Sequence, residues 1–565
     1  MNFNSKQIPL APSPTRCQLV VSVAIVFFLS ISICFVFSLS QGLPYPLIHD
    51  EYSYCLAGET FASGRLTNAT HPMAEHFETM HVLQYPTNMS KYPPGQGIVL
   101  AIGHWIGHPI FGVWLSLALA CAAMCWAMAA VFDVVWASVC CILFAFSMNC
   151  TFYLVQIGYW AQSYWGGSVA CLGSALALGS VLWMSRDVNS ASASLGRDSA
   201  SGSRIAPAGC ASAVLTTVFV IGSWILAISR PLEGLMVAVP MVIAMLRLWI
   251  KVAMSASCLA TLNRLALPIL VGLLGFIWLG YYNAKVTGSP LLLPYTCYQQ
   301  QYALAPLFLR QPRNESPGFQ NEPMRAFHEE WEVGVYQSQQ TWQGYLEKKQ
   351  SDLTLLWGFF LGISLSIPVV VGCLVSAVLM FRQPRSGIAP VVWIGGAAIG
   401  LFLLVHSQTV WMNPHYLAPL VPILWCFIGL GLVYLSSWKV FQFEFGLLLA
   451  IGCVGFAAIE RYEEFDTSSS RMASVDLWHH QRQRIETQLQ STPGQHLVLI
   501  EYAPFHSPHD EWCYNSADID RSKIVWARDL GSDKNDALLR YFSHRSVHRL
   551  AVDAGHVTHQ TLTDK

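Results

Sequence analysis

The chain has 565 residues, of which 53% are hydrophobic and only 12% are charged, and its formal net charge is −1. Soluble domains carry about 25% charged residues, so the composition excludes an ordinary soluble enzyme and predicts a polytopic membrane protein. The near-neutral charge, without a basic block, excludes nucleic acid as a partner. The 16 cysteines show no C-x-x-C spacing, and we interpret them as small buried apolar residues rather than metal ligands or disulfides.

The first apolar run, 19–39, is longer than the core of a signal peptide and ends without a small-residue cleavage site. We therefore predict an uncleaved first transmembrane helix with its N-terminus in the cytoplasm. Ten more runs have the length and apolar character of membrane spans. They lie at 110–131, 134–153, 167–184, 211–229, 234–250, 265–283, 355–381, 388–408, 417–437 and 442–459.

Basic residues in the short loops predict the orientation of these spans, because Lys and Arg accumulate on the cytoplasmic side. All four basic loops then fall on the side of the N-terminus. They contain Arg186, Arg197 and Arg204; Arg247, Lys251 and Arg264; Arg382 and Arg385; and Lys439. The apolar run 97–105 is too short to cross the membrane, so we predict a helix lying at the interface. The 189–209 stretch, rich in Ser and Gly, is predicted to be an inner flexible linker.

Two adjacent acids, Asp50 and Glu51, follow the first span. Charges at the edge of a membrane are costly unless they face water or perform a function. In glycosyl transfer, a carboxylate can take the proton of the attacking nucleophile. Acids also stabilise the N-terminus of a helix, so a purely structural role is the alternative.

The remainder of this outer loop, 41–109, closes on Lys91-Tyr92-Pro93-Pro94-Gly95. A cation before a Pro-Pro turn suits a phosphate near the membrane surface, although interfacial lysines also snorkel. The loop is rich in histidine, but it has no tight H-x-x-x-H pair. We therefore predict no cofactor, and a divalent metal is not favoured.

An Asp-Glu pair after the first span and a loop closing on Lys-Tyr-Pro-Pro-Gly resemble the GT-C glycosyltransferases, in particular the protein O-mannosyltransferase and aminoarabinose-transferase branch. The resemblance implies a helical bundle with large loops on one face, often followed by an outer soluble domain. It implies a donor sugar carried on polyprenyl or dolichyl monophosphate. It also implies that Asp50 is the catalytic base and that Lys91 lies near the donor phosphate.

The outer loop 154–166 departs from that family, because many members carry a second acid there and this loop has no carboxylate. A two-acid metal site is therefore not expected. We predict instead that polar and aromatic side chains line the substrate or lipid site, although an interfacial aromatic belt would look the same. They are Tyr54, Tyr92, Tyr159, Trp160, Gln162, Tyr164 and Trp165.

Two further residues are candidate phosphate ligands. Arg230 lies at the outer end of the fifth span and needs a partner, either Glu233 or a phosphate oxygen. His415 opens the tenth span, where the resemblance implies a donor contact; a satisfied interfacial histidine is the alternative. Lys285 is a weaker candidate. Within the outer loop 284–354, the segment 290–309 is either a lid over the donor or an amphipathic surface segment.

The C-terminal segment has the pattern of a small α/β domain. Helices are predicted at 476–490 and 535–542, and strands at 496–500, 524–526 and 547–552. The predicted fold is thus mainly α and polytopic, with about eleven spans. Residues 1–459 form the transmembrane domain, and 460–565 form an extracytoplasmic α/β domain.

We predict a membrane glycosyltransferase that moves a sugar from a polyprenyl-phosphate donor to an unknown acceptor on the outer face, with inversion. Asp50 acts as base, Glu51 orients the site, and Lys91, Arg230 and His415 hold the donor phosphate. A transporter or flippase of lipid-linked sugars is the alternative; such proteins usually show internal repeats, and none is evident here. A non-catalytic assembly protein working through its C-terminal domain is a third possibility.

Overall fold

The structure is a computed structural model that describes residues 14–195, 209–254, 257–319, 321–382, 387–439, 443–473, 477–504, 506–553 and 556–562. Of the loop arginines used for orientation, Arg197, Arg204 and Arg385 lie outside this part of the chain, as does most of the predicted 189–209 linker. Within it, ten helices are long and apolar enough to cross a membrane, and α5 (Val134–Cys150) is a shorter apolar helix. The predicted polytopic, mainly α architecture is confirmed.

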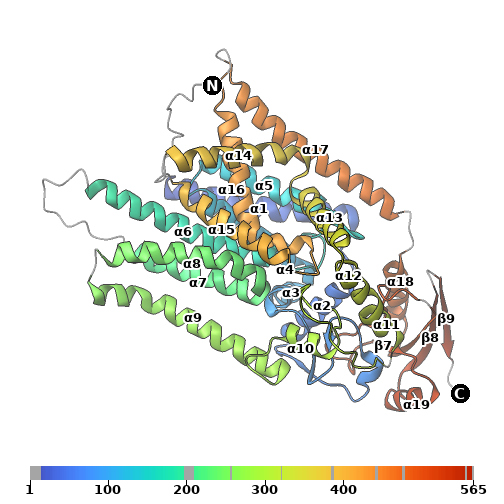
Figure 1. The fold of residues 1–565 in the computed structure, drawn as a ribbon. Helices are drawn as coiled ribbons and strands as arrows, with labels where there is room; N and C mark the ends of the chain where they lie inside the picture. The colour runs from blue at the N-terminus through green and yellow to red at the C-terminus, as the bar shows by residue number, and fades with distance from the viewer. Residues whose placement is uncertain are drawn as a thin grey trace.

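The long helices lie side by side as a bundle, and α2, α10 and the C-terminal strands lie at one end of it (Figure 1). The long helices are α1 (Arg16–Gln41), α4 (Pro109–Met128), α6 (Ser168–Leu195), α7 (Gly209–Ser229), α8 (Pro231–Ala253), α9 (Cys258–Thr287), α14 (Gly362–Arg382), α15 (Ala389–His406), η3 with α16 (Pro414–Leu420, Val421–Ser436) and α17 (Phe445–Ala473).

Shorter elements fill the loops at that end. They are α2 (His49–Ala62), β1 (Asn68–Ala69), η1 (Ala74–Phe77), β2 (Val82–Leu83), β3 (Thr87–Ser90), α3 (Pro94–Ile106), β4 (Phe152–Tyr153), β5 (Gln156–Ile157), α10 (Pro294–Gln301), α11 (Glu322–Arg325), η2 (Ala326–Glu332), α12 (Val333–Ser338) and α13 (Trp342–Phe360). Strands β1, β3 and β2 form an antiparallel sheet in that order, and β4 pairs with β5.

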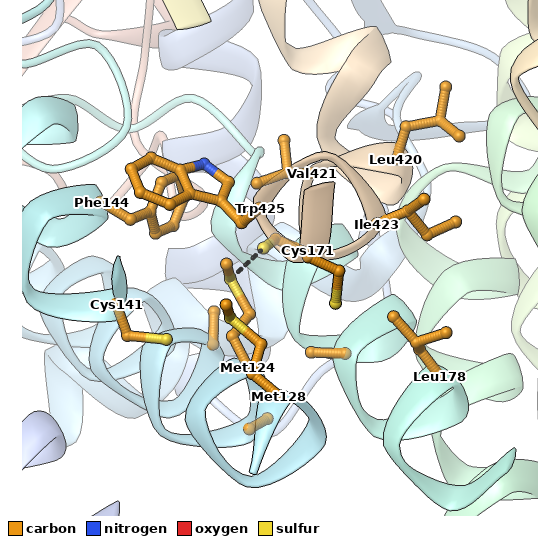
Figure 2. Packing of buried hydrophobic residues seen from close by; sticks show 14 of the residues in the cluster. Met124, Met128, Cys141, Phe144, Cys171, Leu178, Leu420, Val421, Ile423 and Trp425 are labelled. Carbon is orange, nitrogen blue, oxygen red and sulfur yellow. Dashed lines mark hydrogen bonds between the residues drawn. The ribbon is translucent and has the colours of Figure 1, made fainter. Parts of the chain in front are cut away.

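The centre of the bundle lies between α4, α5, α6 and α16 (Figure 2). There the ring of Trp425 lies 5.4 Å from that of Phe144, and the Cys171 sulfur lies 3.5 Å from the Met124 sulfur. The most apolar stretch of α6 is 83% buried, whereas that of α1 is 17% buried. Helices α4, α6 and α16 are therefore packed inside the bundle. Most of α1 is exposed on the outside of the bundle, where lipid would contact it.

Helix α3 occupies the segment predicted to lie at the interface. Its 13 residues rise only about 20 Å, too little to span the membrane. It packs against α4 through glycines: a Cβ on Gly112 would lie 1.9 Å from the Val99 carbonyl oxygen. This close approach ties the loop that carries Lys91 to the bundle.

The predicted span 355–381 begins too early, because the helix is interrupted at Gly362 and a new helix, α14, starts there. That residue has φ +60°, and a Cβ there would lie 2.6 Å from a Glu460 carboxylate oxygen. The same carboxylate accepts from the Ile363 N–H at 3.0 Å and caps α14. Residues up to Phe360 therefore belong to α13. Glu460 also lies within α17, which runs across the expected domain boundary to Ala473.

The C-terminal segment folds as α18 (Trp478–Ser491), β6 (His496–Tyr502), β7 (Ile524–Arg528), α19 (Ser532–Tyr541), β8 (Ser546–Asp553) and β9 (His556–Leu562). The sheet order is β7-β6-β8-β9, with β6 parallel to β7 and β8 and β9 antiparallel to β8. The predicted helices and strands are present. Strand β9 was missed because it is an edge strand rich in His, Thr and Gln, without an apolar run.

Candidate active site

The two acids of the pair both lie in the first turn of α2, and their side chains point in different directions. Adjacent residues on a helix point about 100° apart, so Asp50 and Glu51 meet different surroundings. The Asp50 side chain is 22% exposed and lines a cavity, whereas Glu51 is fully buried. The structure therefore places the two acids, which were predicted to have different roles, in different surroundings.

Glu51 is satisfied entirely by the protein. Its carboxylate accepts from the Leu47 N–H at 2.8 Å, from the Tyr164 N–H at 2.7 Å, and from the Gln156 side-chain amide. Burial raises its pKa to about 7, and the two backbone hydrogen bonds oppose that rise. Glu51 joins α2 to the 154–166 loop and does not line the cavity. Its predicted role in orienting the site stays a prediction.

The cavity has a volume of about 510 Å³ and brings together predicted residues from four separate elements. Asp50 comes from the first turn of α2, Lys91 from the chain after β3, Arg230 from the start of α8, and His415 from η3. Tyr92 also lines it. Much of the remaining wall is apolar: Ala227, Leu232, Leu279, Leu293, Leu307 and Phe308.

Asp50 is held from two sides. The Tyr92 hydroxyl donates to Oδ1, and His81 Nε2 lies 3.7 Å from Oδ2. The β2–β3 sheet brings these neighbours together, since the Lys91 N–H donates to the His81 carbonyl at 3.1 Å. Burial raises the pKa of Asp50, while the Lys91 charge and the Tyr92 hydrogen bond oppose the rise. The carboxylate is oriented, and it still faces the cavity.

Lys91 lies in an aromatic cage rather than in an ion pair. Its Nζ lies 4.8 Å from the ring centre of Tyr298, 5.2 Å from that of Tyr92 and 5.5 Å from that of Tyr295. Burial lowers its pKa to about 8, against the carboxylate charges of Asp50 and Glu332. Aromatic faces attract a cation but do not neutralise it, so the ammonium can still bind an anion.

Arg230 is the second cation of the wall. Its guanidinium lies 5.1 Å from the ring centre of Tyr416, and it occupies the N-cap position of α8, where the helix end adds positive potential. Across the described residues, no carboxylate oxygen lies within 4.0 Å of Lys91 or Arg230. Glu233, one of the two partners considered for Arg230, lies 4.0 Å from His406 Nε2.

His415 completes the cluster. Its Nδ1 is hydrogen-bonded to the Tyr159 hydroxyl, and its ring lies 4.8 Å from that of Trp165. The Tyr159 contact fixes the ring and leaves Nε2 for a ligand.

The aromatic residues predicted to line the site mostly lie behind it. Tyr159 and Trp165 support His415, and Tyr54 stacks on Tyr92 at 4.5 Å. Trp160 is fully buried, with its ring 5.6 Å from that of Phe360. Of the predicted lining residues, only Tyr92 belongs to the cavity wall.

Two polar members of that set are engaged elsewhere. The Gln162 amide donates to the Cys34 carbonyl and to Asn149 Oδ1, both at 2.8 Å. The Tyr164 hydroxyl donates to the Pro44 carbonyl at 2.7 Å. The reason is topological: the 154–166 loop folds into the protein beneath α2 and does not lie along the membrane surface.

Several wall residues were not identified from the sequence. Glu332, Trp331, His406 and Trp411 all line the cavity. Glu332 accepts from His328 Nδ1 at 2.7 Å, and Trp331 stacks on Trp411 at 5.2 Å. No local motif marks them, because they come from loop and helix-end segments far apart in the chain. Of the other expectations, Tyr295 of the 290–309 segment belongs to the wall, and Lys285 does not.

The histidines of the first loop do not converge. His71 Nε2 lies 3.1 Å from Asp520 Oδ1, and His76 Nδ1 lies 2.9 Å from the Arg528 carbonyl, both in the C-terminal region. His81 lies near Asp50, and its ring is 5.8 Å from that of His49. Among the residues with described positions, no group of three or more His, Cys, Asp or Glu side chains has the arrangement of a metal site.

The C-terminal region holds α2 in place. The Tyr514 ring stacks on Tyr52 at 4.1 Å, and its hydroxyl lies 2.6 Å from His49 Nδ1. Arg482, almost fully buried, donates to the Tyr514 carbonyl at 3.0 Å. His509 lies 4.7 Å from the ring of Trp331, so this region also reaches the rim of the cavity.

No family model matches the chain, and no curated protein matches it by sequence. Solved structures with a similar arrangement include an oligosaccharyltransferase from Archaeoglobus fulgidus, with 12% identity, a TM-score of 0.49, and 95% of this chain and 69% of that chain covered. ArnT from Cupriavidus metallidurans is similar at 11% identity and a TM-score of 0.44, covering 94% of this chain and 92% of that one. At this level of similarity, a function for this chain has to rest on its own residues.

Proposed function

We propose that the chain is a membrane glycosyltransferase that takes a sugar from a polyprenyl-phosphate donor. The observation that carries this proposal is one cavity lined by a carboxylate, Asp50, by two cations, Lys91 and Arg230, and by an apolar wall. Among the described residues, no carboxylate oxygen lies within 4.0 Å of either cation. Buried charges without partners are costly, so a bound anion would stabilise both cations. A lipid-linked phosphate provides that anion together with a chain suited to the apolar wall.

The same residues can carry out the transfer. Asp50 accepts the proton of the acceptor nucleophile as its electron pair attacks the anomeric carbon. The bond from that carbon to the phosphate oxygen breaks on the opposite face, which inverts the configuration. Lys91, Arg230 and His415 Nε2 stabilise the charge that develops on the departing phosphate, where fixed positive groups contribute most to the rate.

Orientation of Asp50 is part of the proposal. The Tyr92 hydroxyl occupies Oδ1, which leaves Oδ2 as the oxygen for the acceptor proton. His81 lies near Oδ2, and burial holds its pKa well below the ordinary value, so it is neutral near pH 7. A neutral His81 imidazole forms no ion pair with the Asp50 carboxylate, so the Lys91 ammonium is the nearby charge that stabilises it.

The test is transfer by the purified protein from a panel of polyprenyl-monophosphate sugars, with the wild type beside Asp50→Asn. We expect transfer by the wild type with at least one donor and none by the variant. Equal thermal unfolding of the two proteins controls for folding. Full activity of Asp50→Asn would overturn the mechanism. Movement of a lipid-linked sugar across vesicles without transfer would favour the flippase.

A further inference from the structure

A second hollow lies at the other end of the bundle, between α6, α8 and α15. It has a volume of about 700 Å³. Helix α8 contributes Arg230 to the candidate site and Arg247 to this hollow, and α15 contributes His406 to the site and Trp393 to the hollow. The two therefore lie at opposite ends of the same two helices, and we call the second one the distal groove.

The distal groove is open to the surroundings of the bundle. Of the residues lining it, Trp393 is 67% exposed and Ile243 is 47% exposed. The rest of its apolar lining is Val181, Pro240, Ala244, Leu248, Ile394 and Ala397, of which Val181, Pro240, Leu248 and Ile394 are buried. In a membrane these surfaces meet acyl chains, and an exposed tryptophan near a helix end is typical of the membrane interface.

The two cations of the distal groove lie toward one end of it. Along α8, the lining runs from Pro240 to Lys251, which at 1.5 Å per residue is about 16 Å. This length matches one leaflet of a hydrocarbon core about 30 Å thick. Arg247 and Lys251 stand four residues apart, on one face of α8 and near its end. On α6, Asn189 lies on the same side of the groove's apolar part.

The charged residues in the described lining of the distal groove are basic. Its described lining includes Arg247 and Lys251 and no aspartate or glutamate. An apolar furrow one leaflet deep with two cations at its mouth matches the shape and charge of an anionic lipid. A zwitterionic lipid offers the same chains, but its own cation would face Arg247.

We propose that the distal groove binds an anionic glycerophospholipid of the leaflet opposite to the candidate active site, with its phosphate at Arg247 and Lys251 and an acyl chain along Pro240, Ala244 and Ile394. The bound lipid would fill the space between α8 and α15. Both helices also carry walls of the candidate site, so the lipid would brace them from the distal side.

The test is native mass spectrometry of the full-length protein released from nanodiscs of equal phosphatidylglycerol and phosphatidylcholine. We expect wild type to retain phosphatidylglycerol selectively. In Arg247→Gln/Lys251→Gln, its affinity should fall roughly thirtyfold, because two surface cations are lost. Ala244→Trp, which fills the apolar part, should lower the retention of that lipid while the two charges remain.

The matched control is Lys439→Gln, which removes a basic residue at the same end of the bundle but outside the distal groove. It should retain phosphatidylglycerol as wild type does. Equal retention of the two lipids by wild type, or unchanged selectivity in the double variant, would overturn the proposal. Replacement of the bound lipid by added polyprenyl phosphate at equal concentration would also overturn it, because the groove would then serve the carrier.

Discussion

The wall of the candidate site and the 154–166 loop behind it lie side by side, and both are rich in aromatic residues, yet their side chains meet different surroundings. In the wall, Asp50, Lys91 and Arg230 face a cavity, and the two cations have no carboxylate within 4.0 Å across the described residues. In the loop, residues 158–166 are buried, and the Gln162 amide donates its hydrogen bonds within the protein. The wall carries charged side chains that line a cavity, whereas the loop has no charged residue and is packed mostly inside the protein.

The acid pair shows the same contrast at the scale of one helical turn. Glu51 accepts hydrogen bonds from Leu47, Tyr164 and Gln156 and is fully buried. Asp50 keeps a carboxylate oxygen toward the cavity. A polar group with all its partners inside the protein stabilises the fold, and one held in place but open to a cavity is available for chemistry.

The strongest test of this contrast compares two single variants, Asp50→Asn and Glu51→Gln, in the same assay. Loss of a general base typically lowers a rate by about 10²–10⁴-fold, so Asp50→Asn should lose transfer while unfolding at the wild-type temperature. The measurement is the initial rate of sugar transfer, with a thermal melt of each protein. A melt lowered in step with the activity would show that Asp50 is structural instead.

Lys91→Gln should have the next largest effect. A hydrogen bond to a charged group contributes about 1.5–3 kcal/mol, so losing it should lower kcat/KM for the lipid-linked donor roughly ten- to hundredfold. Lys285→Gln is the matched control, because Lys285 lies near the Tyr281 ring and outside the cavity wall. If the two variants lose equal activity, Lys91 has no special role in binding the donor.

Glu51→Gln should act on stability rather than on chemistry. The amide nitrogen of Gln would face an N–H donor and leave it unpaired, at a cost of about 1–3 kcal/mol. We expect a lower midpoint of unfolding and, in the folded fraction, a kcat close to that of wild type. A selective loss of kcat at unchanged stability would place Glu51 in the catalytic machinery after all.

The smallest effect is in the pH profile. Asp50 must be deprotonated, so activity should rise with pH through a pKa above the ordinary carboxyl value of 3.8, because burial raises it. Lys91 must stay protonated, so activity should fall as pH rises past about 8. Lys91→Arg should move the alkaline limb upward, because a guanidinium stays charged. An alkaline limb that remains near pH 8 in this variant belongs to another group.

Much of the fold followed from the sequence because membrane spans are recognised locally. A run of about 20 apolar residues must form a helix in lipid, whatever its neighbours are. The start of α14 was placed wrongly for a non-local reason: its cap, Glu460, comes from α17, almost a hundred residues later. Strand β9 was missed because its pairing with β8 defines it, and its own pattern does not.

The sequence by itself determined the polytopic helical class, because long apolar runs identify membrane spans. It offered Asp50 and Arg230 as candidates because they are charges at the ends of spans, Lys91 because it precedes a Pro-Pro turn, and His415 through the family resemblance. Only the tertiary structure decided which polar residues face the same space. It brought Glu332 and His406 to the wall and placed Trp160 and Glu51 behind it. The physical reason is that side-chain direction depends on how helices and loops pack, and packing joins residues hundreds of positions apart.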